Sequence, residues 1–150
     1  MIKIICVGNI KEKYLEDAIK EYSKRISKYT KLEIIEVNDL SNLEDKCLKK
    51  EAELIEKHLD QKDYIITLDI EGKEISSVDL SNKINEINIS YPNIVFIIGG
   101  SLGLDNSIKE KANYSLSFSK MTFPHQLFRV ILLEQIYTSF KILNNETYHK

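Results

Sequence analysis

The sequence contains little cysteine, proline or glycine and no tryptophan: two, two and five residues among 150. Cys6 and Cys47 are far apart, and the three histidines stand in no zinc-type spacing with them, so we expect reduced thiols and no metal site. No run approaches the ~20 apolar residues of a membrane span, and the N-terminus lacks the pattern of a signal peptide. These absences predict a cytoplasmic protein that uses neither membrane nor metal.

The sequence also lacks a strong net charge, which is −2 at neutral pH, but its charges are segregated. Residues 1–31 hold eight Lys/Arg and four Asp/Glu, residues 32–108 hold seven and sixteen, and residues 109–150 hold six and three. Basic ends that meet in space would attract phosphates, whereas solvated helix faces are the simpler interpretation. The first predicted helix carries a basic stripe of Lys20, Lys24 and Lys28, with Arg25 nearby, and we hypothesise that this stripe contacts the phosphates of a nucleic-acid backbone.

Strand and helix patterns alternate along the chain. Short β-branched apolar runs predict strands covered on both faces, and three- and four-residue spacing predicts helices. The predicted strands are Ile2–Val7, Leu32–Val37, Asp63–Ile70, Asn93–Ile98 and Asn113–Phe118. The predicted helices are about 11–29, Leu43–Leu59, Ser77–Ile87, Asn106–Lys111 and Pro124–Leu143. This order predicts one α/β domain over residues 1–150, a three-layer sandwich with a mostly parallel sheet.

Every glycine follows a predicted strand, and the cluster Gly99, Gly100 and Gly103 lies where such sheets bind ligands. The cluster matches neither a dinucleotide fingerprint nor a phosphate-binding loop, because it comes late and no Lys-Ser or Lys-Thr follows. No G-x-S-x-G nucleophile elbow is present. What remains is a bend where the absence of Cβ lets another group approach the main chain. From the glycines alone, a simple turn and a ligand loop are equally good interpretations.

A second segment, Leu116–Tyr137, crosses a polar stretch and enters a helix at Pro124. His125 and Arg129 are four residues apart and project from one side of its first turns. The rest of this helix is apolar nearly all round, and the other helices look too polar to cover it. We therefore expect a symmetric homodimer, the alternative being that helices of the same subunit surround it.

From end to end, the chain closely resembles the RlmH family, the ribosomal large-subunit (pseudouridine-N3) methyltransferases of the SPOUT superfamily. The resemblance is carried by "VGNIKEKY", "ITLDIEGKEISS", "VFIIGGSLGL", "LSFSKMTFPHQLFRVILLEQIYTSFKI" and "YHK". It implies a C-terminal deep trefoil knot, which sequence reasoning alone would not propose. It also implies S-adenosyl-L-methionine as cofactor and a homodimer as the active form.

The resemblance also implies site residues. The cofactor contacts would be Leu68, Gly99, Phe118, Ser119, Lys120, Met121, Thr122 and Phe123. Without the resemblance, Leu68 and Met121 read as core residues. His125 is a candidate catalytic base or hydrogen-bonding partner, or else a structural contact at a helix start. Arg129 is a second catalytic candidate that could hold a phosphate or carbonyl oxygen, or could pair with Glu134 or an acid of the partner subunit.

The C-terminal tail would ordinarily be disordered. The resemblance implies instead that it reaches the partner's active site and touches RNA through Tyr148, His149 and Lys150. Lys150 stands where some relatives have arginine. A lysine at this position keeps a phosphate contact but loses the bidentate geometry of arginine. The implied function is methylation of N3 of one pseudouridine in 23S rRNA within the assembled ribosome. The alternative is a non-catalytic dimeric module that binds ribosomal RNA.

Overall fold

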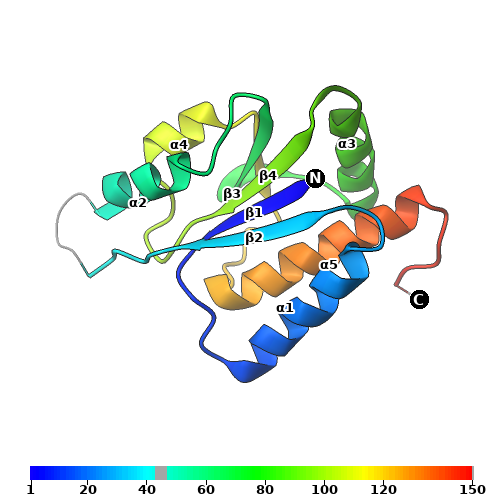
Figure 1. The fold of residues 1–150 in the computed structure, drawn as a ribbon, viewed down its shortest axis with the longest axis horizontal. Helices are drawn as coiled ribbons and strands as arrows, with labels where there is room; N and C mark the ends of the chain where they lie inside the picture. The colour runs from blue at the N-terminus through cyan, green and yellow to red at the C-terminus, as the bar shows by residue number, and fades with distance from the viewer. Residues whose placement is uncertain (43–46, 150) are drawn as a thin grey trace.

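Parallel strands form a central sheet in the computed structural model, which describes residues 1–42 and 47–149. The strand order is β2-β1-β4-β3-β5, and every pairing is parallel. Figure 1 shows β1 and β4 in the middle of the sheet with the other strands on either side. The bounds are β1 Ile2–Val7, β2 Leu32–Val37, β3 Asp63–Glu74, β4 Asn93–Ile98 and β5 Tyr114–Ser117.

The central strands β1 and β4 are mostly apolar because both of their faces are covered. In β4, "NIVFII", every residue after Asn93 is buried. Phe96 pairs with Ile4 of β1 and Ile66 of β3, and all three side chains are fully buried on the same face. Val95 and Ile97 point to the opposite face and belong to a second apolar cluster. This alternation explains why both runs are rich in β-branched residues; in β1 the polar exception is Lys3, whose ammonium donates to the His58 carbonyl over 3.1 Å.

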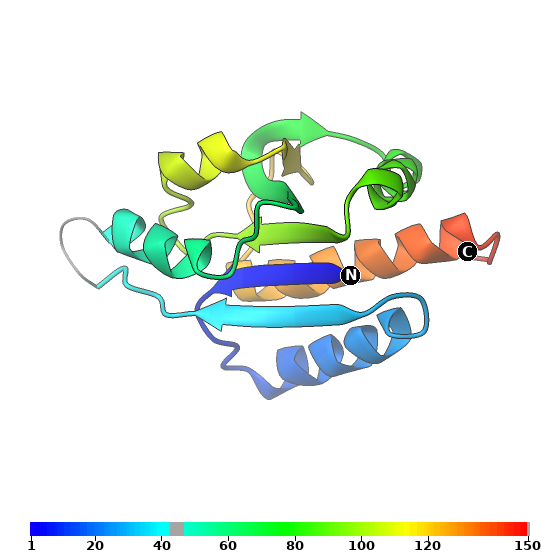
Figure 2. The same ribbon diagram turned by 45° about the horizontal axis from the view of Figure 1, so that its top comes forward.

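The helices divide between the two faces of the sheet (Figures 1 and 2). One face carries α1, α3 and α5, whose buried residues share a core with Ile4 and Phe96. The other face carries α2 and α4, which pack with Val95 and Ile97. The bounds are α1 Lys13–Ile26, α2 Cys47–Glu56, α3 Ser77–Ser90, α4 Asn106–Lys111 and α5 His125–Leu143. The three-layer α/β fold with a parallel sheet is thus confirmed.

The predicted end of the third strand, Ile70, is wrong. Gly72 lies inside β3, which continues to Glu74 after a register irregularity, so that Leu68 and Lys73 both pair with Leu116 of β5. A Cβ at Gly72 would stand 2.8 Å from the backbone of Ser115 and Leu116, so the glycine permits close pairing with β5 rather than a turn. The predicted start of the second helix, Leu43, lies outside the described residues.

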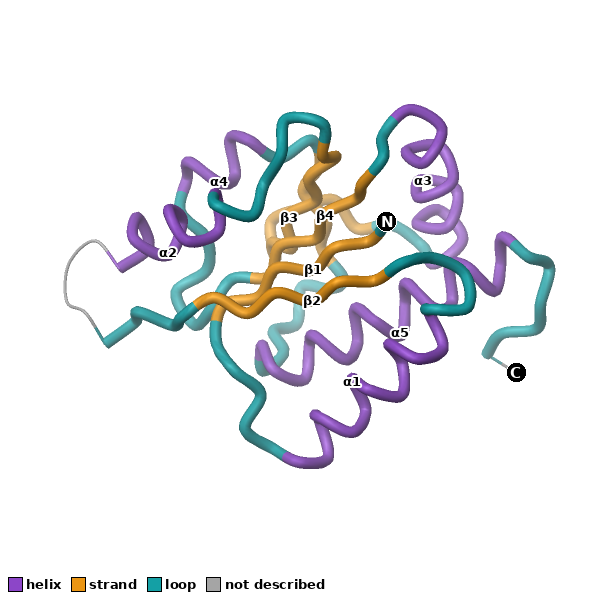
Figure 3. Tube along the Cα trace, in the orientation of Figure 1, coloured by secondary structure: helices purple, strands orange, loops and turns teal. Residues whose placement is uncertain are grey.

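The last helix is covered by its own subunit more than its sequence predicts. Figure 3 shows α1 running beside α5. Tyr22 of α1 and Tyr29, three residues past its end, contact Tyr137, and Tyr29 also stacks on Phe140 with the ring centroids 5.7 Å apart. On the other side, the Ser77 hydroxyl of α3 donates to Gln135 over 2.6 Å. The helices that look too polar by composition therefore turn their aromatic and small side chains toward α5.

Both cysteines are buried free thiols. Burial raises the pKa of Cys6 to about 12, although the nearby Arg129 charge opposes the rise.

Among the described residues, no helix is long and apolar enough to cross a membrane. The trefoil knot concerns how the chain threads through itself, and it stays a prediction.

Candidate functional site

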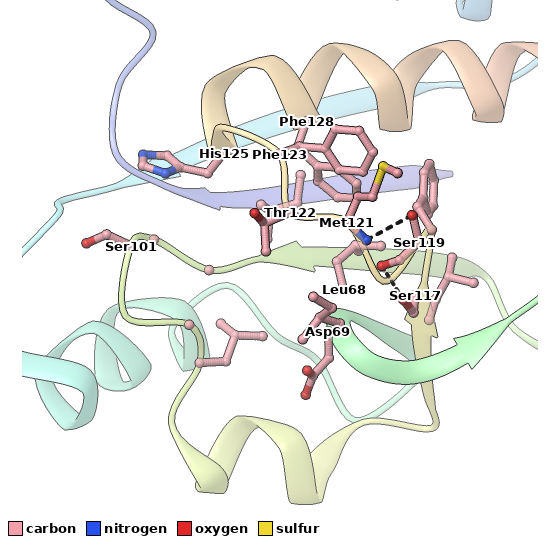
Figure 4. Close-up of a pocket in the computed structure, with 18 of the residues that line it drawn as sticks. Leu68, Asp69, Ser101, Ser117, Ser119, Met121, Thr122, Phe123, His125 and Phe128 are labelled. Carbon is pink, nitrogen blue, oxygen red and sulfur yellow. Dashed lines mark hydrogen bonds between the residues drawn. The ribbon is translucent and has the colours of Figure 1, made fainter.

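A pocket of about 370 Å³ lies beyond the carboxyl ends of β4 and β5. Two bends form most of it: residues 98–104 at the end of β4 and residues 117–123 at the end of β5 (Figure 4). The first turn of α5 and residues 68–70 of β3, next to its register irregularity, complete the wall. This is the edge where parallel α/β sheets bind ligands, and the volume falls in the range of small-molecule sites.

The first bend depends on close contact between its own main-chain segments. Gly100 and Gly103 form an isolated antiparallel bridge, and the Gly103 amide donates to the Gly100 carbonyl over 3.0 Å. A Cβ on Gly99 would stand 2.6 Å from the Gly103 carbonyl oxygen, nearer than any real Cβ comes to such an atom. Glycine is therefore required at position 99 for the bend to close on itself.

The second bend is organised by serine hydroxyls. The Ser119 hydroxyl accepts a hydrogen bond from the Met121 amide over 3.0 Å, a short side-chain-to-backbone turn. The Ser117 hydroxyl donates to the Ser119 carbonyl over 3.1 Å, and Figure 4 shows both bonds. Within the described chain, the amides of Lys120, Thr122 and Phe123 have no hydrogen-bond partner. The bend thus combines a fixed shape with free backbone donors.

The pocket walls are mostly apolar, with charge at one side. Leu68, Leu104 and Met121 contribute apolar surface, and Phe128 packs edge-on against Phe118 with centroids 5.0 Å apart. A lysine–aspartate pair also belongs to the lining: Lys109 Nζ of α4 lies 3.2 Å from an Asp69 carboxylate oxygen at the end of the regular part of β3. An apolar cavity with few polar groups is typical of a site that orients a small molecule.

Seven of the eight residues expected to contact a cofactor line this pocket, although their segments are up to 55 positions apart in sequence. Lys120 is the exception, since its side chain is exposed outside the lining. Four further residues line the pocket that are not among the predicted site residues: Asp69, Ser101, Lys109 and Phe128. Asp69 directly follows Leu68 and could have been found from its place at a strand's carboxyl end.

His125 lines the pocket from the first turn of α5, and in Figure 4 its ring points away from Ser119 and Met121. The pKa of the nearby Asp39 carboxyl lies below its usual value, mainly because Ser41 donates to it, with smaller contributions from the charges of His125 and Lys11. The Lys11 amide donates to Gln126 over 3.0 Å and ties the β1–α1 loop to the start of α5. His125 therefore stands where this loop meets the pocket.

Arg129 lies behind the pocket rather than in it. Its buried guanidinium donates to a Glu36 carboxylate oxygen of β2 and, over 3.1 Å, to the Gly8 carbonyl that ends β1. The expected partner, Glu134, instead accepts from Thr138 and Gln135 on its own helix. In this geometry Arg129 fastens α5 to the ends of two strands. Arg129 does not line the pocket, and the catalytic role predicted for it stays a prediction.

The C-terminal tail folds back onto α5 of its own subunit. Asn145 adopts a left-handed backbone just past the helix end, and His149 Nε2 then contacts the Glu134 carboxylate and lies 3.2 Å from the Thr138 hydroxyl. Neither Tyr148 nor His149 lines the pocket, and Lys150 lies outside the described residues. A substrate role for these residues stays a prediction.

Part of the basic stripe on α1 is neutralised within the helix. Lys20 pairs with Glu16 over 3.2 Å, and Arg25 pairs with Glu21 over 2.9 Å. Arg25 also lies over the Tyr22 and Tyr137 rings. The stripe is thus less basic than the lysine spacing indicates.

Residues 1–42 and 47–149 contain no cluster of three or more His, Cys, Asp or Glu side chains suited to a metal ion.

The parallel three-layer fold and its pocket between two late bends define an α/β protein with a small-molecule site. A family model described as "Predicted SPOUT methyltransferase" matches residues 1–149, and the chain belongs to this SPOUT methyltransferase family. A relative from Methanococcus vannielii, named putative ribosomal RNA large subunit methyltransferase H, is 59% identical and aligns over 99% of both chains. The Clostridium tetani protein, named ribosomal RNA large subunit methyltransferase H, is 52% identical over the same shares. The family resemblance stated from the sequence is confirmed.

A solved structure supports the fold independently. The probable methylase family protein from Haemophilus influenzae Rd KW20 superposes with a TM-score of 0.57 at 16% identity, over 99% of this chain and 70% of that one. At this identity the likeness concerns the fold alone. The arrangement of strands and helices described above is therefore shared with a solved structure.

Proposed function

We propose that this chain methylates N3 of a pseudouridine in 23S rRNA, with S-adenosyl-L-methionine as methyl donor, in the cytoplasm on the assembled ribosome. The observation that carries the proposal is the 52–60% identity, over nearly the full length, to proteins named ribosomal RNA large subunit methyltransferase H. The pocket supports it, because the bends that the family resemblance assigns to the cofactor meet at one cavity.

The residues of the pocket fit this cofactor. Adenine is flat and mostly apolar with donors and acceptors along its edges, so the apolar side chains of Leu68 and Leu104 suit its faces and the free amides of the second bend suit its edges. When bound, S-adenosylmethionine supplies an activated methyl group on a sulfonium. The protein's task is then to hold and orient the reactants and to exclude water.

The target nitrogen carries a proton that must leave as the new bond to carbon forms. His125 lies at the pocket and can accept a proton or donate a hydrogen bond to a carbonyl oxygen of the base. We assign this role to His125 alone, because Arg129 is held by Glu36 and Gly8.

The active form is a homodimer in this proposal, with the tail of one subunit completing the pocket of the other. Apolar side chains remain exposed where α1 and α5 begin: Tyr14 follows the Lys11–Gln126 contact, and Leu127 is 38% exposed beside it. Met121 and Phe123 are exposed next to the pocket. A second subunit on this face would cover apolar surface and bring foreign residues to the pocket.

Leu127→Glu is expected to turn a dimer into a monomer, because a carboxylate at this apolar face opposes burial. Light scattering measures the mass, and methylation of ribosomes should fall at least about a hundred-fold (~2.8 kcal/mol). The control is Ile89→Glu on α3, where the native side chain is 81% exposed and far from the pocket lining. A fully active monomeric Leu127→Glu variant would overturn the dimeric site.

The function itself is tested by mass spectrometry of 23S rRNA from cells that lack this protein. We expect one pseudouridine to lose its methyl group and to regain it when the gene is restored. An unchanged rRNA would refute the proposal. Calorimetry with S-adenosylmethionine separates the alternative, since a purely RNA-binding module would release no heat with the cofactor.

A further inference from the structure

We propose that the Asp69–Lys109 pair is the receptor for the amino-acid end of the cofactor, with Lys109 binding its α-carboxylate and Asp69 its α-ammonium. The inference rests on the proposed function and names residues that the family resemblance does not assign. It explains why an otherwise apolar and hydroxyl-bearing pocket contains one acid and one amine side by side.

The pair consists of opposite charges on two different elements. Asp69 follows Leu68 at the end of the regular part of β3, and Lys109 lies on α4, with 3.2 Å between Nζ and Oδ2. Among the described residues that line the pocket, the other ionisable side chain is that of His125. In Figure 4 the Asp69 side chain extends from β3 toward the α4 ribbon, at the side of the pocket away from the second bend. The pair therefore marks one charged side of the pocket.

Asp69 is held in place, while Lys109 keeps freedom to move. The Asp69 side chain is 17% exposed, and its second oxygen accepts from the Glu71 amide over 3.1 Å. The Lys109 side chain is 40% exposed and makes no other ion pair among the described residues. A partly exposed pair of this kind contributes little to folding. Its stabilising value is small enough that a ligand can rearrange it.

The charge pattern of the pair matches a zwitterion. The α-ammonium and α-carboxylate of an amino acid are separated by a single carbon atom, and the carboxylate and ammonium of the pair are separated by a comparable short gap. Docking the two groups side by side replaces one ion pair with two charge-assisted hydrogen bonds. Because the pair is neutral overall, it favours a zwitterion over a simple anion or cation.

The test compares two probes. S-Adenosylhomocysteine carries the full amino-acid end, whereas 5′-methylthioadenosine has the same nucleoside and sulfur without it. Calorimetry with each probe is performed on the wild type, Asp69→Asn and Lys109→Met. We expect each variant to lose about ten-fold or more in affinity for S-adenosylhomocysteine while its affinity for 5′-methylthioadenosine stays within about two-fold. Lys109→Arg should keep most of the affinity.

The matched control is Lys111→Met on the same short helix, since Lys111 pairs with Glu56 over 3.1 Å and does not line the pocket. It should bind both probes as the wild type does. Equal losses for both probes in Asp69→Asn would place the carboxylate on the ribose, and unchanged affinities would leave the pair without a ligand; either result overturns the inference. A wild-type protein that binds neither probe would instead refute the proposed function.

Discussion

Gly99→Ala is expected to abolish S-adenosylmethionine binding, with a loss of affinity of at least about a hundred-fold (~2.8 kcal/mol). The added methyl carbon would stand 2.6 Å from the Gly103 carbonyl oxygen and 2.7 Å from its carbon, and both are main-chain atoms that cannot turn aside. The bend must open to accommodate it, and opening moves the wall formed by Gly100, Ser101 and Leu104. Calorimetry measures the loss of affinity.

Gly100→Ala provides the control one residue away. Its new Cβ would meet the Cγ1 atom of the Val7 side chain at 3.0 Å, and a small shift relieves the contact. We expect cofactor affinity within a few-fold of the wild type. Thermal unfolding of both variants separates a damaged bend from a damaged fold. Wild-type affinity in Gly99→Ala would show that this bend does not hold the cofactor.

Glu36→Gln should lower the free energy of unfolding by about 2 kcal/mol, because it leaves the buried Arg129 guanidinium without its counter-charge. Removing one partner of a fully buried pair costs about 3–5 kcal/mol, but Glu36 is 40% exposed and water screens the pair. The Nε of Arg129 already lacks a hydrogen-bond partner among the described residues, so the guanidinium depends on Glu36 to compensate its charge. Urea denaturation measures the change.

A double-mutant cycle completes this test. Arg129→Met removes the buried charge, and Glu36 then remains partly solvated, so we expect the double variant to be more stable than the sum of the two single losses allows. Additive losses would show that the two side chains do not stabilise each other. Cofactor affinity measured on the same variants reports whether fastening α5 to β1 and β2 also shapes the pocket.

The strands were the most predictable part of the fold. Three strands have the predicted bounds, because a short run rich in β-branched residues specifies a strand: Ile2–Val7, Leu32–Val37 and Asn93–Ile98. The extension of β3 through Gly72 was not predictable, because it depends on pairing with Leu116, more than forty residues later. Local patterns locate elements, while distant partners decide where they end.

The structure brings together some of the predicted site residues, and the roles predicted for the others stay predictions. The residues of the second bend gather at the pocket because they follow one strand directly, and strand ends meet at one edge of the sheet. Arg129 was assigned from its spacing with His125, and spacing does not show that Glu36, 93 positions earlier, captures it. The tail was given a substrate role, whereas here His149 contacts Glu134 of its own helix.

The position of β4 between β1 and β3 affects how the nascent polypeptide folds. While translation has not yet reached residue 93, β1 can pair only with β2, and β3 has no neighbour, since β4 and β5 come later. The two halves of the sheet become one body only when this late strand inserts between them. An interrupted product would therefore leave one edge of β1 and both edges of β3 unpaired, the kind of surface that invites aggregation.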